Sequence, residues 1–338
     1  MSTLDRLALP FDQYQRYTIA AEVADLAREH LGKPRLCVLD AGGYYRTRQD
    51  QEVLPLVQFL PHDQVFALDL VAAVLPNYTL ASGLCLPYGD KTFDLVVSCD
   101  TLEHIAPANR LTFVDELLRV TRHLLLLIAP FDSEATRSAE QRWNEYMIAR
   151  GVHHKQLQEH QRLGLPEAGS LRAALAQRSL KTVDLPDGYL PHWLAMMLIK
   201  HTSGQSLEFQ LDLDRYYNRY LSAGDRREPS YRRVFVVALP GSEGLLPDIT
   251  ARYRAANAEM LTKHTSTASG LGFATDLIHL LEQIESQAAD CLSRVAALEV
   301  ENTRLRQLVA AYERGRFIRT VRWLHSQRKH LRGWLKGD

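Results

Sequence analysis

Apolar and polar residues alternate along the first 240 residues in blocks that predict strands and helices in turn. Short, mainly apolar runs with few polar positions are typical of strands buried on both faces of a parallel sheet. Six such runs lie at 35–40, 64–69, 93–98, 122–129, 180–185 and 231–239. Helical patterns lie before or between them, at 14–31, 48–60, 108–120 and 190–202. The alternation predicts an α/β fold with a doubly wound, mostly parallel sheet in a domain spanning residues 1–240.

A heptad pattern replaces this alternation toward the end of the chain. Two offset series of mostly apolar residues recur every seven positions over 277–312, including Leu298 and Leu305 at d and Val295, Asn302 and Val309 at a. Leucine at d, valine at a and one buried asparagine favour a parallel two-stranded coiled coil. We therefore expect a coiled coil at 275–313 that forms a homodimer through residues 277–312, joined to the domain by a linker at 241–274. One amphipathic helix packed on its own domain would show a similar pattern.

The remaining segment, 314–338, is basic. After Tyr312 the chain holds eight Lys and Arg against two acidic residues, whereas the whole sequence has 40 of each and no net charge. Apolar residues such as Phe317, Trp323 and Trp334 lie among the arginines, a composition that suits an amphipathic helix on an anionic membrane surface. A solvated extension of the coiled coil or a contact with a partner protein would have the same composition. We expect no nucleic-acid partner, because the total charge is zero and no RNA-binding module is recognisable.

The spacing of the cysteines and the lengths of the apolar runs indicate the cellular compartment of the protein. The four cysteines, Cys37, Cys85, Cys99 and Cys291, show no CxxC spacing and predict reduced thiols. The N-terminal residues lack the basic and apolar regions of a signal peptide. No apolar run approaches the roughly 20 residues that cross a bilayer. We expect a cytoplasmic protein, with residues 314–336 in peripheral contact with the inner face of the membrane.

Polar residues and glycines follow the predicted strands and mark a ligand site. The first strand ends in Leu39-Asp40-Ala41-Gly42-Gly43, and the second ends at Asp69. Glycines let the backbone turn sharply and approach a ligand closely. A carboxylate at the end of the next strand can accept both hydroxyls of a ribose. Ligands of open α/β sheets bind at these carboxyl ends, so the two features indicate a nucleotide-like ligand.

A third segment makes the pattern specific. It runs Leu86-Pro-Tyr-Gly-Asp-Lys-Thr-Phe-Asp-Leu-Val-Val-Ser-Cys-Asp-Thr-Leu-Glu-His104. With this segment, the chain resembles the class I S-adenosylmethionine-dependent methyltransferases over about residues 15–240, in particular a bacterial group with the pattern LPF-x-D-x-x-FD-x-V followed by LEH. The resemblance implies S-adenosylmethionine as cofactor. It implies cofactor contacts by Asp40, Gly42 and Gly43 at the methionine end, Asp69 at the ribose, Ser82 and Leu84 (or Leu86) near the adenine, and Cys99 facing the methyl group.

Two departures from the family pattern affect the expected activity. Tyr44-Tyr45-Arg46 replaces the second and third glycines of the loop, and Ser82 replaces an acidic residue near adenine. An alternative is therefore a catalytically inactive scaffold that acts through its coiled coil and basic segment. A nicotinamide-dependent dehydrogenase would leave the segment 86–104 unexplained, and its G-x-G-x-x-G loop is absent from the sequence.

Methyl transfer to a hydroxyl needs alignment and a general base. His104 is the first candidate for the base and Asp100 the second. His104 could instead be a helix-start residue bonded to backbone, and Glu103 could stabilise the same helix through its positive end.

A charged, helix-prone insertion at 132–178 is expected to cover the acceptor pocket. It carries His153, Glu159 and His160, a spacing that matches no standard zinc pattern, so we expect no metal. The run from His154 to Pro166 resembles a segment of methyltransferase-domain proteins in bacterial surface-glycan clusters. The resemblance favours O-methylation of a sugar or glycan-linked acceptor in surface-polysaccharide synthesis.

Overall fold

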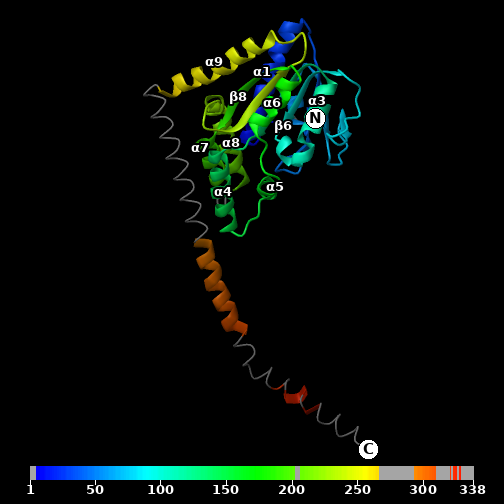
Figure 1. Cartoon of the computed structure of the whole chain (residues 1–338). Helices are drawn as coiled ribbons and strands as arrows, with labels where there is room; N and C mark the ends of the chain where they lie inside the picture. Colours follow the sequence, from blue (N-terminus) through cyan, green and yellow to red (C-terminus); the bar gives the residue numbers. More distant parts are fainter. Residues whose placement is uncertain are drawn as a thin grey trace, which may run out of the picture. The chain divides into compact units, whose positions relative to one another are not determined.

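A computed structural model describes residues 5–201, 206–265 and 293–309, together with residues 320, 323–325 and 327–328. Its main feature is a seven-stranded sheet with the order β5-β4-β1-β6-β7-β9-β8 (Figure 1). The strands are β1 (Cys37–Ala41), β4 (Gln64–Asp69), β5 (Tyr78–Leu80), β6 (Phe93–Cys99), β7 (Thr121–Pro130), β8 (Lys181–Tyr189) and β9 (Ser230–Ala238). Neighbouring strands pair in parallel except at β9, which runs antiparallel to both β7 and β8. The predicted doubly wound, mostly parallel α/β sheet is confirmed.

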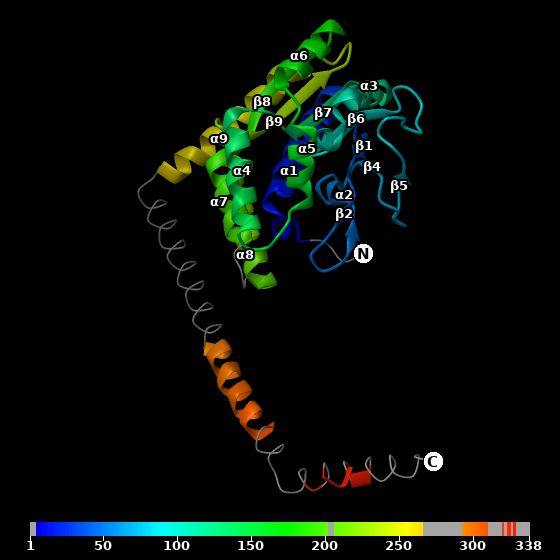
Figure 2. The same cartoon turned by 60° about the horizontal axis from the view of Figure 1, so that its bottom comes forward.

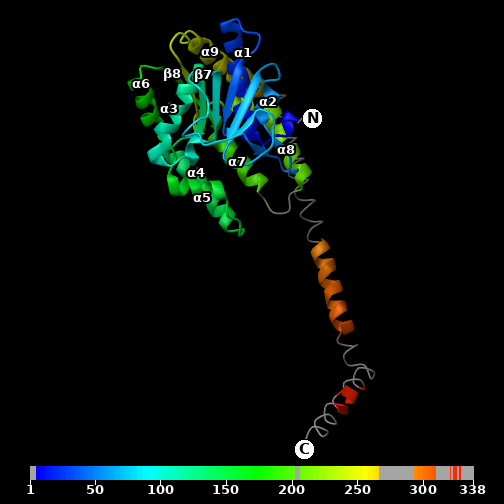
Figure 3. The same ribbon diagram turned by 90° about the vertical axis from the view of Figure 1, so that its right-hand side faces the viewer.

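Successive residues of the central strands pack into two separate cores, one on each face of the sheet. In β7, Leu124 and Leu126 face one core, and Leu125 and Leu127 face the other. The first core also contains side chains of α1 (Phe11–Leu31), α2 (Pro55–Phe59) and α9 (Leu245–Thr265), and the second those of α3 (Arg110–Val120) and α6 (Ala168–Gln177). Figure 3 shows α3 and α6 on the side of the sheet opposite α2. This two-sided burial explains why the strands read as continuous apolar runs.

The predicted insertion forms three helices. They are α4 (Glu134–Ile148), α5 (Lys155–Leu163) and α6. Helix α4 packs beside α7 (Leu190–Lys200), as Figure 2 shows, and α5 packs against the short 3-10 helix η2 (Leu102–His104) after β6. The insertion therefore reaches the carboxyl ends of the strands.

Several elements differ from the sequence-based prediction. Residues 48–60 are mostly not helical, because a small hairpin of β2 (Tyr45–Arg46) and β3 (Glu52–Val53) turns at Asp50, which has a φ of 64°. Strand β5 escaped prediction because its three residues lie at the sheet edge and none is fully buried. Helix α8 (Leu207–Tyr220) also escaped prediction.

The predicted linker at 241–274 begins with a helix of the domain. Leu245, Ile249 and Tyr253 of α9 are buried in the same core as α1. The compact unit accordingly extends to residue 269, and a second unit covers 270–338.

In the second unit, residues 293–309 form a helix. Its predicted seam residues Val295, Leu298, Leu305 and Val309 are all exposed in the single chain. The rest of the heptad region and most of the basic segment 314–338 lie outside the described residues, so the coiled coil, the homodimer and the membrane contact stay predictions. None of the helices within the described ranges has the length and apolarity needed to span a bilayer.

Candidate functional site

The candidate site lies where β1, β4 and β6 end side by side. Strand β1 pairs with β4 on one side and with β6 on the other, all in parallel, so their carboxyl ends meet at one edge of the sheet. The last residues of β1, β4 and β6, together with the loops that follow these strands, carry most of the residues that the sequence predicted for the site. Ligands of open α/β sheets bind at this edge.

The turn after β1 brings backbone close to the neighbouring loop. Gly42 has a φ of 92°, and its N–H donates to the Leu68 carbonyl of β4 at 2.9 Å. A Cβ on Gly42 would lie 2.2 Å from Oγ1 of Thr101, and one on Gly43 would lie 2.4 Å from the carboxylate of Asp40. Both glycines are therefore required by the packing of this turn.

Asp40 is buried at the end of β1, with 1% of its surface exposed. Among the described residues, neither of its carboxylate oxygens has a hydrogen bond of ordinary geometry, although the Tyr17 hydroxyl lies close enough to stabilise the carboxylate. Burial raises the pKa of Asp40 to about 7, against smaller opposing effects of the Tyr17 hydroxyl and the Arg16 guanidinium. A buried carboxylate in such a position is costly unless a cationic group binds to it.

Asp69 ends β4 and is only partly buried. Its Oδ1 accepts a hydrogen bond from the Leu70 N–H at 2.6 Å. The ring of Tyr44, which replaces a family glycine, turns toward the hairpin. Its hydroxyl donates to Glu52 at 3.0 Å, and its ring centroid lies 6.1 Å from that of Tyr78. These contacts with Glu52 and Tyr78 hold the Tyr44 ring beside the edge of the sheet.

The other predicted cofactor residues lie in different environments. Ser82 is exposed, and its Oγ accepts from the Leu84 N–H at 3.2 Å. Leu84 is partly buried and packs against the second core. Cys99 is buried at the end of β6, where burial raises the pKa of its thiol. Cys99 therefore lies next to the turn that follows β1. The Ser82 hydroxyl is instead bonded within its own loop.

Asp100 is held by two arginines. Nε of Arg232 donates to Oδ1 at 2.8 Å and Nη2 donates to Oδ2 at 2.6 Å, while Arg16 forms a second ion pair with the same carboxylate. Asp100 itself adopts a φ of 45°, which is unusual for a residue other than glycine. A carboxylate with two guanidinium partners is a poor proton acceptor. The geometry therefore favours His104 over Asp100 as the general base.

His104 lies in η2, the 3-10 helix that follows β6. Its Nδ1 is 2.9 Å from Oε2 of Glu159, which comes from α5. Its Nε2 is 3.9 Å from Oε1 of the neighbouring Glu103. Burial, assisted by the nearby His160, lowers the pKa of His104. A neutral imidazole whose Nδ1–H is bound to a carboxylate has a free lone pair on Nε2, as a general base requires.

His160 lies beside His104, with 5.3 Å between the ring centroids. Its Nδ1 is 2.8 Å from Oε1 of Glu140, and the same oxygen accepts from the Tyr231 hydroxyl at 2.7 Å. Burial raises the pKa of Glu103 to about 7. His153, the other histidine singled out in the sequence, is exposed.

Sequence reasoning missed several members of the site. They are Arg16, Glu140, Tyr231 and Arg232. No local motif marks them, because they come from α1, α4 and β9. Glu103 was interpreted only as a helix-stabilising residue, although its place beside His104 in the Leu-Glu-His sequence is a visible signal.

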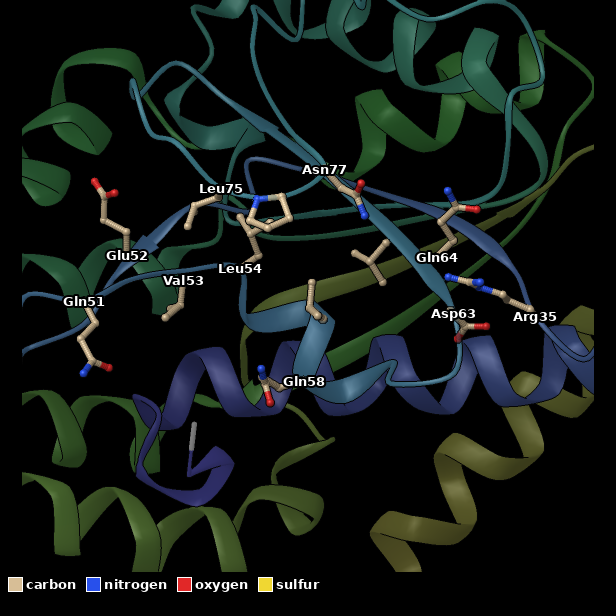
Figure 4. A pocket seen from close by; sticks show the side chains of 13 residues that line it. Arg35, Gln51, Glu52, Val53, Leu54, Gln58, Asp63, Gln64, Leu75 and Asn77 are labelled. Carbon is tan, nitrogen blue, oxygen red and sulfur yellow. The ribbon is translucent and has the colours of Figure 1, made fainter. Parts of the chain in front are cut away.

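A cavity of about 420 Å³, which neither Asp40 nor Asp69 lines, extends from the amino ends of the strands along α2 to Glu52 of the β2–β3 hairpin (Figure 4). Arg35, Gln64 and Asn77 line it, from positions just before β1, at the start of β4 and just before β5. The carboxyl ends of the same strands carry Asp40 and Asp69. This cavity is therefore not part of the candidate site.

Comparison with known proteins gives one family match and several similar structures. Residues 52–126 match a family model described as a methyltransferase domain. No curated protein matches the sequence. Among solved structures, a magnesium protoporphyrin IX methyltransferase from Synechocystis PCC 6803 with bound SAH is 14% identical, covering 68% of this chain and 85% of that one at a TM-score of 0.39.

Two other solved structures are similar to a comparable degree. A Burkholderia thailandensis 1,6-didemethyltoxoflavin-N1-methyltransferase is 15% identical, covering 66% of this chain and 78% of that one at a TM-score of 0.36. The plantazolicin methyltransferase BpumL in complex with SAH is 12% identical, covering 68% and 86% at a TM-score of 0.39. Likeness at this level indicates no substrate.

The strand-end residues fit S-adenosylmethionine, which carries an ammonium, a sulfonium and a ribose diol. The buried Asp40 fits a cationic group, Asp69 offers a carboxylate at a ribose position, and the close packing of Gly42 and Gly43 fixes the turn between them. The mostly parallel sheet with helices on both faces matches the Rossmann-like fold of this enzyme class. Residues 52–126 of this chain therefore match a methyltransferase domain, and the strand-end residues around that match fit S-adenosylmethionine.

Proposed function

We propose that this protein transfers the methyl group of S-adenosylmethionine to a hydroxyl oxygen of a sugar or glycan-linked acceptor in surface-polysaccharide synthesis. One observation supports a hydroxyl as the acceptor. Glu159 binds His104 and orients it as a general base beside the turn that follows β1. Support for the sugar comes from the resemblance of residues 154–166 to proteins of glycan clusters.

The residues have separate roles in this proposal. When bound, S-adenosylmethionine supplies an electrophilic methyl group on a sulfonium leaving group. Asp40 and Asp69 hold the two ends of the molecule in the orientation that alignment requires. His104 accepts the acceptor's hydroxyl proton on Nε2 as the new C–O bond forms and the C–S bond breaks. Glu159 keeps that imidazole in the required tautomer.

The insertion supports the proposed lid over the acceptor. Helix α5 contributes Glu159 and His160 to the cluster around η2. Arg110 of α3 donates to the carbonyls of Ile105 (at 3.1 Å) and Gly164, and thereby connects the loop after η2 with the end of α5. An acceptor bound beside His104 would therefore lie between the sheet edge and α5.

Cofactor binding is tested by calorimetric titration of the full chain with S-adenosylmethionine and S-adenosylhomocysteine. Asp69→Ala removes the proposed hydrogen bonds to the ribose and should weaken binding by more than about 100-fold, from charge-assisted bonds of about 1.5–3 kcal/mol each. Asp248→Ala, an exposed aspartate of α9, serves as the matched control and should bind as the wild type does.

Absence of binding to the wild-type chain at millimolar ligand would refute the proposed activity and favour the scaffold alternative. Transfer of labelled methyl groups to a panel of mono- and oligosaccharides then tests the acceptor class. Methylation of amines in place of hydroxyls would contradict the O-methyl assignment.

A further inference from the structure

The cluster at the end of β6 brings three ligand atoms together. Glu103, His104 and His160 each offer one such atom, and these atoms all lie within 4.8 Å of one another. Two of the residues follow β6 directly, and the third comes from α5 in the insertion. Glu103 and His160 are more than nine-tenths buried.

Both imidazoles are held in the same tautomer by a carboxylate on their outer side. Nδ1 of His104 faces Glu159 at 2.9 Å, and Nδ1 of His160 faces Glu140 at 2.8 Å. An ionised carboxylate only accepts hydrogen bonds, so each Nδ1 carries the proton and each Nε2 carries a lone pair. Metal-binding histidines almost always donate their other N–H in this way.

The inner atoms of the cluster lack partners. Within the part of the chain that the structure describes, Nε2 of His160 and Oε2 of Glu103 are buried without a hydrogen bond. The separation of 3.9 Å between Nε2 of His104 and Oε1 of Glu103 is too long for one. Two potential ligand atoms that are buried without a partner are unfavourable, and a bound cation would satisfy both of them.

The ligand set selects the class of cation. Two neutral imidazoles and one carboxylate form a common catalytic zinc site with an open fourth position, whereas magnesium prefers oxygen ligands alone. Ligand atoms about 2.1 Å from a zinc ion lie about 3.4 Å apart in tetrahedral geometry. The three side chains would thus have to move inward only slightly from their present positions.

We propose that Glu103, His104 and His160 bind a divalent transition-metal ion, zinc in the first place. Glu159 and Glu140 orient the two imidazoles, and Tyr231 in turn holds Glu140. This assignment differs from the sequence-based expectation of no metal, which considered His153, Glu159 and His160. The fold instead pairs His160 with residues 56 and 57 positions earlier in the chain.

The role of the ion rests on the proposed function. A coordinated Nε2 has no lone pair left for a proton, so His104 would then act as a ligand and not as a base. An acceptor hydroxyl in the open fourth position would release its proton to solvent water more readily, because a bound cation lowers the pKa of an oxygen that coordinates it. The site itself does not depend on methyl transfer.

The test measures Zn²⁺ binding directly. The full chain is dialysed against a chelator and titrated with Zn²⁺ by calorimetry, with the bound metal counted by mass spectrometry. The wild type should bind one ion per chain. Glu103→Gln and His160→Ala should each weaken binding at least 100-fold, and Glu159→Gln should weaken it about 10- to 100-fold through loss of orientation. His153→Ala, the exposed histidine of the same insertion, should bind as the wild type does.

Two results would overturn the metal site. One is the absence of saturable Zn²⁺ binding by the wild type, and the other is binding by Glu103→Gln and His160→Ala equal to that of the wild type. Circular dichroism establishes that each variant is folded, and the nearly isosteric Glu103→Gln decides the matter if His160→Ala unfolds. S-adenosylhomocysteine binding is measured on the same chelated protein. Cofactor binding without Zn²⁺ binding refutes the metal site alone, whereas Zn²⁺ binding without cofactor binding supports the site and refutes the proposed function.

Discussion

Asp40 shows how a single buried side chain can lower the stability of the domain that holds it. Its carboxyl group keeps its proton up to a pH of about 7 in the folded chain, compared with an ordinary value of 3.8. Between these values the unfolded chain releases a proton that the folded chain retains. Folding is therefore most favoured below pH 4 as far as this group is concerned, and that contribution is lost as the pH rises toward 7.

Replacing Asp40 by Asn should remove this pH dependence. Without cofactor, Asp40→Asn should be more stable than the wild type at pH 8, by about 2–4 kcal/mol, and should gain little at pH 4. Urea unfolding at the two pH values measures the difference. Asp248→Asn, at an exposed position, is the control and should follow the wild type. If Asp40→Asn exceeded the wild type in unfolding free energy by the same amount at both pH values, the raised pKa of Asp40 would be contradicted.

Residues at strand ends could be predicted from the sequence, and their partners could not. Asp40, Asp69 and His104 follow apolar runs, so their place at one sheet edge follows from the parallel order of the strands. The sequence offered Asp100 as the second candidate after His104, because nothing local shows that Arg16 and Arg232 reach its carboxylate. Such long-range ion pairs depend on the packing of distant elements.

At the scale of elements, α9 shows where the pattern of residues misled the prediction. Pro240-Gly241 and the change in composition suggested that the domain ended there. In the structure, the first half of α9 packs against α1 and places Ile249 and Tyr253 in the core. The second half of the helix has only two large apolar residues, Met260 and Leu261, so the buried stripe is too short to be distinguished from a polar linker.

Truncating a buried side chain of α9 should therefore destabilise the methyltransferase domain. Ile249 is 2% exposed, and Ile249→Ala should cost about 2–5 kcal/mol of unfolding free energy. Arg252→Ala, on the exposed face of the same helix, should change stability by less than about 0.5 kcal/mol. Chemical denaturation of the full chain measures both. Equal effects of the two substitutions would show that α9 contributes nothing to the core.

The strands were easier to predict than the segments between them. Long strands such as β6 and β7 are buried on both faces and read as apolar runs, whereas β5 has three partly exposed residues. The region predicted as a helix at 48–60 contains a hairpin because Asp50 adopts a left-handed conformation. Turn geometry of this kind depends on single residues, and a periodic pattern does not reveal it.

For the whole molecule, the question is how many copies of the chain act together. The helix at 293–309 exposes Val295, Leu298 and Leu305 along one stripe, which a parallel partner helix would cover. Asn302 lies in the same stripe and would pair with its symmetry mate. We therefore retain the homodimer as a proposal, together with membrane contact by the basic segment that follows.

Charged residues in the seam should separate the dimer. In the full chain, Leu298→Lys combined with Leu305→Lys should convert a dimer into a monomer, because each lysine would be buried against its symmetry mate. Val300→Lys combined with Gln307→Lys puts the same two charges at outer f positions and should leave the dimer intact. Sedimentation equilibrium distinguishes the two outcomes. A monomeric wild-type chain, or a dimer that survives the seam substitutions, would refute the coiled coil.

The reversed direction of β9 also has a consequence for how the protein is made. Because β9 runs opposite to its neighbours, its first residues, and not its last, arrive at the functional edge: Tyr231 supports Glu140, and Arg232 clamps Asp100. The turn after β1 is synthesised early, whereas Tyr231 and Arg232 leave the ribosome some 130 residues after Asp100. A nascent chain can therefore form most of the sheet long before its site is complete. Tyr231 and Arg232 can complete the site only once the last strand has entered between β7 and β8.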